Sequence, residues 1–271
     1  MAKAKGVFLS LFLVLLLGCA TGQNGNPGGG LVLFSTPQEI KIGAQAAREI
    51  ERKYRVVRNP VVSSYVNEVG QRLAQVCDRP NLVYHFKVLE GKDVNAFSLP
   101  GGWVYIFTGL LEKLDNTAQM AGVLGHEIGH IVARHAMKRL QWAMGIGILY
   151  AAVAGESSPL TQNALKFLLN IVMSGYSRSN ERQADHLGFI YEYRAGYNPQ
   201  GIIQVMEILR GIHHGKVASW QKFLLDHPPP EERIALLKSY LSKLPPSALD
   251  YPFYRKEYHE KVLKPLRDLG Y

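Results

Sequence analysis

The spacing of hydrophobic residues predicts helices over most of the chain. Residues 36–39 (Thr-Pro-Gln-Glu) form a capping box with proline at the first helical position, so a folded domain is expected to begin there. Apolar residues then recur every three or four positions, and the same spacing returns over residues 60–76. The residues expected to face the core are Ile40, Gly43, Ala44, Ala47 and Ile50 in the first helix and Val61, Tyr65, Val66, Val69 and Leu73 in the second.

The period changes to two between residues 82 and 107. Residues 82–89 alternate polar and apolar side chains, and residues 103–107 form a second β-rich run. The segment 95–102, which ends in Pro-Gly-Gly, predicts a hairpin between them. Helical spacing resumes after a cap at Asp115-Asn116 and again over residues 200–211. These elements predict a mainly helical α+β fold with a small sheet.

Composition and charge narrow this picture only slightly. The chain has 271 residues, of which 47% are hydrophobic and 20% charged, so it can form one large domain or two small ones. Its net charge of +9 would suit an anionic membrane surface or acidic substrates. No basic block with interleaved aromatic residues is present in the sequence, so we expect no nucleic-acid partner.

The start of the chain reads as a lipoprotein targeting signal. Lys3 and Lys5 precede an apolar run, residues 7–17, that is too short to span a bilayer comfortably. Residues 16–19 (Leu-Leu-Gly-Cys) match the bacterial lipobox, which predicts removal of residues 1–18 and acylation of Cys19. The alternative is an uncleaved membrane anchor. Both place the domain on the periplasmic side of the bacterial cell envelope.

The lipid would hold the folded domain on a tether. Ala20 after the cysteine, in place of aspartate, resembles lipoproteins sent to the outer membrane. The following segment is glycine-rich and polar, so residues 19–35 are expected to be a flexible tether and residues 36–271 one domain. An acylated Cys19 leaves Cys77 without a disulfide partner, and we expect Cys77 to be a small core or near-surface residue.

The strongest chemical motif lies in residues 125–130, Gly-His-Glu-Ile-Gly-His. On a helix, His126 and His130 share one face, so both imidazoles can reach one metal ion while Glu127 lies beside it. His135 would point about 140° away from His130 on a continuous helix, which argues against a ligand role. The alternative is a buried helix with two hydrogen-bonded histidines.

A third metal ligand is needed because hydrolytic zinc sites commonly have three protein ligands and one water. Glu181 and Asp185 are four residues apart on a predicted helix, so one carboxylate could bind the metal while the other steadies a ligand histidine. These residues alone leave open an ordinary solvated helix face, on which arginines pair with the carboxylates.

With these motifs in this order, the chain resembles the gluzincin endopeptidases that include the CAAX prenyl protease, the heat-shock membrane protease HtpX and the periplasmic β-barrel assembly proteases. The resemblance is carried by residues 126–130, 133–135, 181–185, 95–102 and 227–234. It implies a zincin-like metallopeptidase domain, in which a small mixed sheet packs a substrate-binding edge strand on the H-E-x-x-H helix.

The resemblance also implies roles for individual residues. One zinc ion per chain would be held by His126, His130 and Glu181, with Glu127 as the catalytic base and Asp185 orienting a ligand histidine. An extended peptide would add to the edge strand at residues 95–97; a hairpin that merely closes the sheet is the alternative. The residues assigned to that edge strand are Asn95, Ala96 and Phe97.

Two further residues are candidates for catalysis. The resemblance makes His227, in a proline-rich loop, and Arg233 candidates for stabilising the developing oxyanion. His227 could instead fill the open zinc position and keep the enzyme latent. The third possibility is a helix-capping loop with a salt-bridged arginine.

These features predict a membrane-anchored zinc endopeptidase that hydrolyses extended or misfolded envelope proteins by metal-activated water. The alternative from another class is a zinc-stabilised lipoprotein that acts as a holdase or assembly adaptor, since zinc can stabilise a fold without chemistry. The apolar segment in residues 142–172 is expected to form a buried or lipid-facing hairpin, which would cover the cleft or touch the membrane. Substrate identity and oligomeric state stay open.

Overall fold

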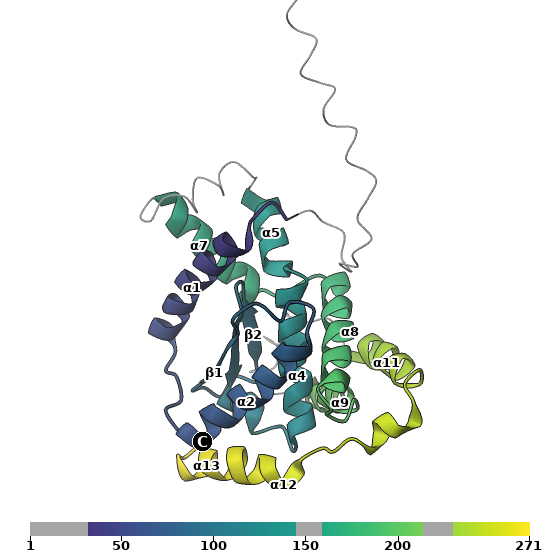
Figure 1. The fold of residues 1–271 in the computed structure, drawn as a ribbon. Coiled ribbons are helices and arrows are strands. Elements are labelled where there is room, and N and C mark those ends of the chain that lie inside the picture. The colour runs from purple at the N-terminus through teal and green to yellow at the C-terminus, as the bar shows by residue number, and fades with distance from the viewer. Residues whose placement is uncertain (1–31, 145–158, 214–229) are drawn as a thin grey trace, which may run out of the picture.

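The protein folds as a set of helices around a three-stranded sheet (Figure 1). The computed structural model describes residues 32–144, 159–213 and 230–271. The elements up to the centre of the chain are α1 (Thr36–Lys53), α2 (Pro60–Val76), β1 (His85–Leu89), β2 (Ala96–Leu99), β3 (Trp103–Phe107), α3 (Thr108–Leu111), α4 (Thr117–Val132) and α5 (His135–Met144). They are followed by α7 (Pro159–Met173), α8 (Arg178–Arg194), α9 (Gly201–His213), α11 (Pro230–Leu241), η1 (Pro246–Asp250) and the C-terminal helical turns α12 (Arg255–Tyr258), η2 (His259–Leu263) and α13 (Lys264–Asp268).

The sheet is small and mixed, as the resemblance implies. Its strand order is β1-β3-β2. β1 runs parallel to β3, with His85 opposite Trp103, and β2 runs antiparallel to β3, with Ala96 opposite Ile106. The predicted hairpin over residues 95–102 is therefore confirmed, and β2 lies at an edge of the sheet. β1 begins three residues later than the expected start at Leu82, although Leu82 itself is buried.

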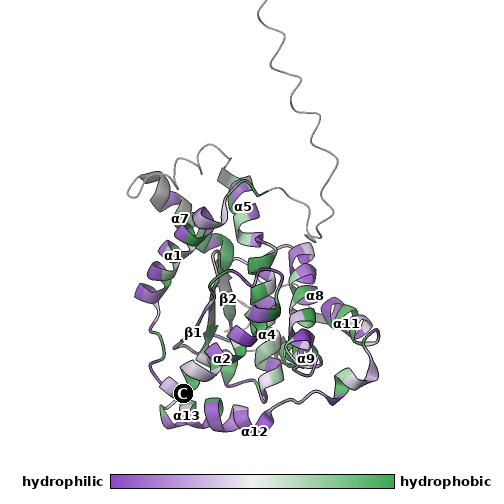
Figure 2. Ribbon diagram, viewed as in Figure 1, coloured by the Kyte–Doolittle hydropathy of each residue, from purple (hydrophilic) through white to green (hydrophobic). Residues whose placement is uncertain are grey.

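Alternating side chains of the strands bury two hydrophobic cores, one on each face of the sheet. On β3, Val104 and Ile106 enter the core shared with α2, α4, α8 and α9. Tyr105 and Phe107 enter the core shared with α1, α5 and α7. The helices turn their hydrophobic sides toward these cores and their hydrophilic sides outward (Figure 2). The sheet is thus enclosed on both faces.

The first helix begins one residue earlier than expected and buries a different stripe. Its N-cap is Ser35, whose hydroxyl accepts from the N–H of Gln38 while the Gln38 side chain accepts from the Ser35 N–H at 2.9 Å. The predicted core position Ile40 is 41% exposed, whereas Glu39 is fully buried. The prediction was wrong because it assigned the inward face to apolar residues, and this face contains a carboxylate. Ala44, also expected inside, is half-buried, and the buried stripe consists of Glu39, Ile42, Gly43, Ala46, Ala47 and Ile50.

The bounds of the second helix are those predicted, residues 60–76. Its N-cap is Asn59, whose side chain accepts from the N–H of Val61 and of Val62. The prediction of Val61 as a core residue was wrong: it is 48% exposed, and Val62 is buried in its place. The other predicted core positions of this helix are buried, so the error is confined to the first turn.

Buried Glu39 connects α1 to the centre of the molecule. Both of its carboxylate oxygens accept from the guanidinium of Arg79, at 3.0 and 3.1 Å. Its second oxygen also lies 2.9 Å from Nε of Arg134, which follows α4. Two cations therefore share one carboxylate, which compensates its burial.

Several expectations lie outside the described residues. These are the signal peptide, Cys19, all but the end of the tether, the centre of the apolar segment in residues 142–172, and His227. Among the described helices, none has the length and apolar character needed to cross a bilayer. Cys77 is buried, as expected for a core residue, with its sulfur 3.3 Å from the hydroxyl of Tyr84.

Candidate metal centre

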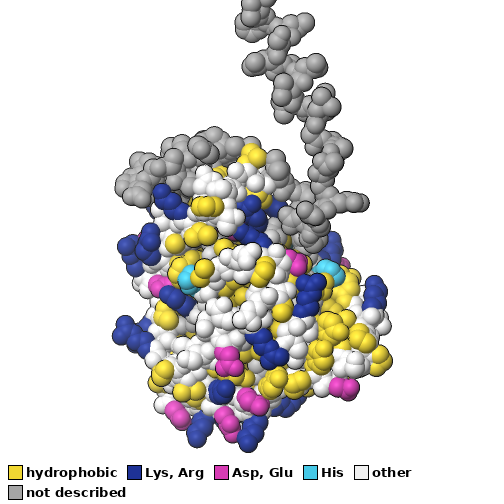
Figure 3. Space-filling model, in the orientation of Figure 1, with side chains coloured by type: hydrophobic (Ala, Val, Ile, Leu, Met, Phe, Trp, Pro, Cys, Tyr) yellow, Lys and Arg dark blue, Asp and Glu magenta, His cyan; other side chains and the backbone are white. Residues whose placement is uncertain are grey.

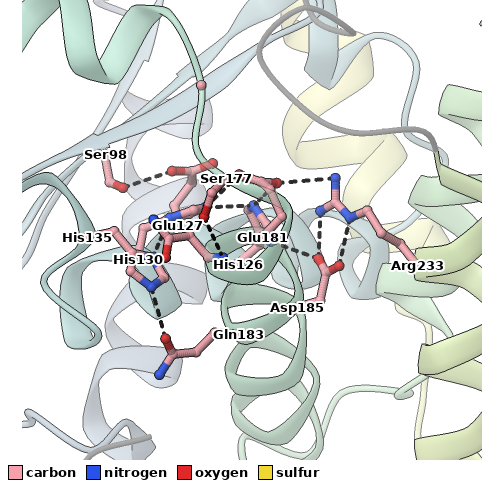
Figure 4. Close-up of polar contacts among 12 residues, drawn as sticks. Ser98, His126, Glu127, His130, His135, Ser177, Glu181, Gln183, Asp185 and Arg233 are labelled. Carbon is pink, nitrogen blue, oxygen red and sulfur yellow. Dashed lines mark hydrogen bonds and ion pairs between the residues drawn. The ribbon is translucent and has the colours of Figure 1, made fainter. Parts of the chain in front are cut away.

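The candidate site lies where two helices cross (Figure 4). α4 is capped by Asn116, as predicted, and is buried along its whole length. It carries the histidine pair in its C-terminal half. α8 begins at the N-cap Ser177, so Glu181 lies in its first turn, where the helix dipole favours a negative charge.

The two helices approach closely because glycines line the crossing. A Cβ atom at Gly129 would lie 2.8 Å from the carbonyl oxygen of Ala184. A Cβ atom at Gly188 would lie 2.7 Å from the backbone nitrogen of His126. Side chains larger than hydrogen would push α8 away from α4. The small residues therefore let Glu181 reach the histidines of the other helix.

His126, His130 and Glu181 meet in a geometry that suits one metal ion. The Nε2 atoms of the two histidines are 3.0 Å apart. Glu181 Oε2 lies 3.5 Å from His126 Nε2, and Glu181 Oε1 lies 3.4 Å from His130 Nε2. A tetrahedral zinc ion with bonds of about 2.0–2.2 Å separates its ligand atoms by about 3.3–3.5 Å. The donor set of two imidazoles and one carboxylate is also one that zinc accepts.

The charges around the site favour a cation. Three buried carboxylates, those of Glu127, Glu181 and Asp185, surround the histidines, and the guanidinium of Arg233 contacts two of them. These groups together carry two negative charges when ionised, which a divalent cation would balance. Burial alone would lower the pKa of His126, but hydrogen bonds and charge from Asp185 and Glu181 raise it to about 10.

Asp185 holds the first histidine from behind. Its Oδ1 atom lies 2.9 Å from Nδ1 of His126, on the opposite side of the ring from the proposed metal ligand atom. Arg233 binds the same carboxylate with Nε at 2.7 Å and one terminal nitrogen at 2.6 Å, and its other terminal nitrogen lies 3.3 Å from Glu181. Burial opposes ionisation of Asp185, yet Arg233 and His126 lower its pKa to about 2.

Glu127 lies beside the candidate metal ligands and receives a hydrogen bond from the sheet. The Ser98 hydroxyl, on β2, donates to Oε2 of Glu127 at 2.8 Å. A pocket lies beside α4, which carries Glu127, and β2, which carries Ser98. Its empty space is about 400 Å³, counting the part open to solvent. It is lined mainly by apolar side chains of α4 and α9, together with Ala96, His126, Glu127 and Arg233.

His135 lies closer to the site than a continuous helix would allow. α4 ends at Val132, and Arg134 adopts a left-handed conformation with φ of 56°. The chain therefore turns back, and Nδ1 of His135 lies 2.9 Å from Nδ1 of His130. Burial and the neighbouring His130 lower the pKa of His135 to about 3. Among the described residues, the group that could hold a metal ion consists of His126, His130 and Glu181 and does not include His135.

The structure also locates the predicted edge strand and Arg233. Ala96 lines the pocket beside Glu127. The Phe97 ring points into the core on the other face of the sheet and stacks on Tyr105 at 5.1 Å. The carbonyl of Asn95 accepts from the N–H of Phe107 and so faces β3. Arg233 is engaged by carboxylates, and its role toward an oxyanion stays a prediction.

Four residues at the site were not recognised from the sequence as part of it. They are Ser98, which holds Glu127; His135 and Gln183, which form a hydrogen-bonded pair; and Tyr176, whose ring stacks on His130 at 4.2 Å. Their positions depend on the crossing of distant elements. His135, Ser98 and Gln183 lie in segments that carry the family resemblance, but none of them was assigned a role at the site from the sequence.

Comparison with known proteins agrees with this geometry. Residues 60–241 match the model of peptidase family M48. The chain belongs to this family. It is therefore a member of a metallopeptidase family, and the matched segment contains the complete candidate site.

Similar proteins of the family come from bacteria and from a yeast. The beta-barrel assembly-enhancing protease of Escherichia coli (strain K12) is 27% identical over 226 residues, which cover 79% of this chain and 46% of the relative. The metalloprotease LoiP of the same organism is 27% identical over 252 residues, 89% of this chain and 98% of the relative. The mitochondrial metalloendopeptidase OMA1 of Schizosaccharomyces pombe is 29% identical over 178 residues, 65% of this chain and 52% of the relative. The chain spans about half the length of the first of these relatives.

Proposed function

We propose that the protein is a zinc-dependent endopeptidase whose metal is held by His126, His130 and Glu181. The observation that carries this proposal is the close approach of these side chains. The two Nε2 atoms are 3.0 Å apart, and each lies 3.4 to 3.5 Å from one of the two carboxylate oxygens of Glu181, with Glu127 beside them. Family membership supports the same chemistry. Zinc bound there would polarise the scissile carbonyl and lower the pKa of a bound water to about 7.

The protein's own residues would then move the proton and keep the geometry. Glu127 takes the proton from the attacking water and delivers it to the amine that leaves when the C–N bond breaks. Ser98 fixes one oxygen of Glu127, so the other is oriented for this transfer. Arg233 bridges Glu181 and Asp185 and holds the ligand set in place. No covalent intermediate on the protein is required.

We propose that an extended peptide binds along β2. In an antiparallel pair, alternate residues direct their backbone groups to the partner strand. Asn95 faces β3 through its carbonyl, so Ala96 and Ser98 direct their backbone N–H and C=O groups to the opposite, open edge. A peptide added there would lie beside Glu127, and recognition would depend on backbone hydrogen bonds. Phe97 supports the strand from the core.

The pocket beside the site adds a side-chain preference to this proposal. Val123 of α4 and Val205, Met206 and Leu209 of α9 provide its apolar lining. An apolar side chain of the peptide would be desolvated there, at a gain of about 25 cal/mol per Å² of buried area. The preferred substrates are therefore extended segments that expose hydrophobic residues, as misfolded proteins do.

We further propose that the domain is anchored in the bacterial envelope through an acylated Cys19, with residues 1–18 removed and 19–35 as a tether. The lipobox supports this, and the matched bacterial relatives include a beta-barrel assembly-enhancing protease. On the face shown in Figure 3, the Lys and Arg side chains are spread out and not gathered in one patch. Acyl chains on Cys19 would supply membrane affinity through burial of their CH₂ groups. Cell fractionation of wild type and Cys19→Ser tests the anchor.

Glu127→Gln tests the proposed reaction. The variant keeps the size of the side chain and the metal ligands but cannot accept the proton, so zinc content should be unchanged and cleavage of unfolded casein should fall by about 10²- to 10⁴-fold. Glu112→Gln, an exposed glutamate on a neighbouring segment, is the matched control. Cleavage by Glu127→Gln at the wild-type rate would refute the mechanism. Prevention of aggregation by both proteins, with no cleavage by either, would favour a holdase.

A further inference from the structure

We propose that His135 is a positioning residue for the zinc ligand His130, and that Gln183 in turn fixes His135. The inference rests on the proposed zinc site. In this proposal, His135 and Gln183 form a hydrogen-bonded chain behind His130. Asp185 and Arg233 form the corresponding chain behind His126.

The hydrogen-bond geometry determines which ring nitrogen of each histidine carries the proton (Figure 4). If His130 binds the metal through Nε2, its Nδ1 carries the proton and donates to Nδ1 of His135 at 2.9 Å. His135 must then carry its own proton on Nε2, which donates to Oε1 of Gln183 at 3.0 Å. Donor and acceptor therefore alternate from the ligand to the glutamine. Hydrogen bonds of this kind fix the tautomer and ring orientation of a metal-bound histidine.

Burial and stacking hold the two rings in this arrangement. His130 is 2% exposed and His135 is 1% exposed, so water does not compete for either Nδ1 atom. The ring of Tyr176 stacks on His130, with the ring centroids 4.2 Å apart, and limits its rotation. Gln183 comes from α8, the helix that also supplies Glu181. The acceptor chain thus joins the same two helices as the metal.

A distant ion pair supports the turn that brings His135 back. The left-handed Arg134 precedes His135, and its guanidinium pairs with buried Glu39 of α1 and donates to the carbonyl of Phe34 at 2.6 Å. A non-glycine residue rarely adopts this conformation without such support. The first helix therefore helps to place the group that orients His130.

Two substitutions separate hydrogen bonding from packing. His135→Asn places an amide oxygen near the position of Nδ1 and keeps an acceptor for His130. His135→Leu fills similar space without an acceptor. The zinc dissociation constant, measured by competition with a fluorescent chelator, should rise by about 10- to 100-fold for His135→Leu, while His135→Asn should keep most of the wild-type affinity. Gln183→Leu should weaken zinc binding by less than His135→Leu.

Controls make each outcome decisive. His259→Leu, at an exposed histidine far from the site, should leave zinc affinity unchanged, and thermal unfolding of the zinc-free proteins checks that each variant folds. If His135→Leu does not fold, wild-type affinity in Gln183→Leu overturns the proposal. Equal losses in His135→Leu and His135→Asn, or no loss in either, also overturn it.

The same titration separates this inference from the proposed function. A wild-type protein that binds no zinc overturns both. Zinc binding with unchanged affinity in His135→Leu overturns the inference alone. Zinc binding by the wild type without peptide hydrolysis overturns the proposed activity and leaves the role of His135 standing.

Discussion

Substitution of Gly188 by alanine should weaken the proposed zinc site, although glycine has no side chain that could contact a metal ligand. A Cβ atom there would lie 2.7 Å from the backbone nitrogen of His126, 2.9 Å from the carbonyl carbon of Gly125 and 3.0 Å from Cα of His126. These are backbone atoms inside a helix and cannot rotate away. Carbon atoms pack best at about 3.5–4.0 Å, so α4 and α8 must separate by roughly 0.5–1 Å.

The expected cost has two parts. Overpacking of this kind destabilises a protein by about 1–3 kcal/mol. For a domain of this size that corresponds to a melting temperature lower by about 2–4 °C per kcal/mol. Glu181 lies two helical turns from Gly188 on the same helix, about 10 Å away, so displacement of α8 also moves the carboxylate from the histidines. Zinc affinity should therefore fall together with stability.

Gly211 provides the matched control for the effect of adding a methyl group to a helix. It lies in α9, and a Cβ atom there would meet no atom of the described residues within 4 Å. Gly211→Ala should leave zinc affinity unchanged and stabilise the protein by about 0.5–1 kcal/mol through helix propensity. Calorimetry of the chelator-treated proteins and zinc titration measure both quantities. Wild-type stability and zinc affinity in Gly188→Ala would refute the argument that glycine sets the helix separation.

Two further predictions concern buried charges. Glu39→Gln should lower the free energy of unfolding, measured by urea titration, by about 3–5 kcal/mol, because it leaves two arginines around a neutral group. The control Glu49→Gln, on the exposed side of α1, should change this free energy by less than about 1 kcal/mol. In the zinc-free protein, burial disfavours ionised Asp185, but Arg233 and His126 lower its pKa from 3.8 to about 2, which stabilises the folded state by about 2–3 kcal/mol. This contribution is fully present above pH 4 and is lost as the pH falls toward 2. The difference in unfolding free energy between wild type and Asp185→Asn should shrink over the same range, and a constant difference would contradict this assignment.

The parts of the fold that could be predicted are those encoded locally. Residues 60–76 carry helical spacing through to their end, and the side chain of Asn116 caps α4 where the sequence predicts. The hairpin followed from the turn sequence Pro-Gly-Gly between two β-rich runs. The inward face of α1 could not be predicted, because a buried glutamate becomes favourable only when Arg79 and Arg134 arrive from elsewhere in the chain.

The candidate site shows the same division. His126 and His130 are four residues apart on one helix, so their spacing predicts a shared face with Glu127 beside it. The placing of Glu181 required the resemblance to a family, since nothing local distinguishes it from a solvated carboxylate. His135 was expected to point away because a helix was assumed to continue through Arg134. The break depends on Glu39, which lies far away in sequence.

The ion pair between Glu39 and its two arginines bears on where the protein can be cut. The segment shared with the family begins at Pro60, after the whole of α1, and ends before Tyr258, whose hydroxyl donates to the carbonyl of Leu111 at 2.6 Å. A fragment trimmed to the shared segment would keep every proposed metal ligand. It would, however, carry the guanidinium groups of Arg79 and Arg134 without Glu39, and it would expose the part of the sheet and core that α1 covers. Homology boundaries therefore underestimate the cooperative unit, and a truncation that preserves it must start upstream of Ser35 and retain the C-terminal turns.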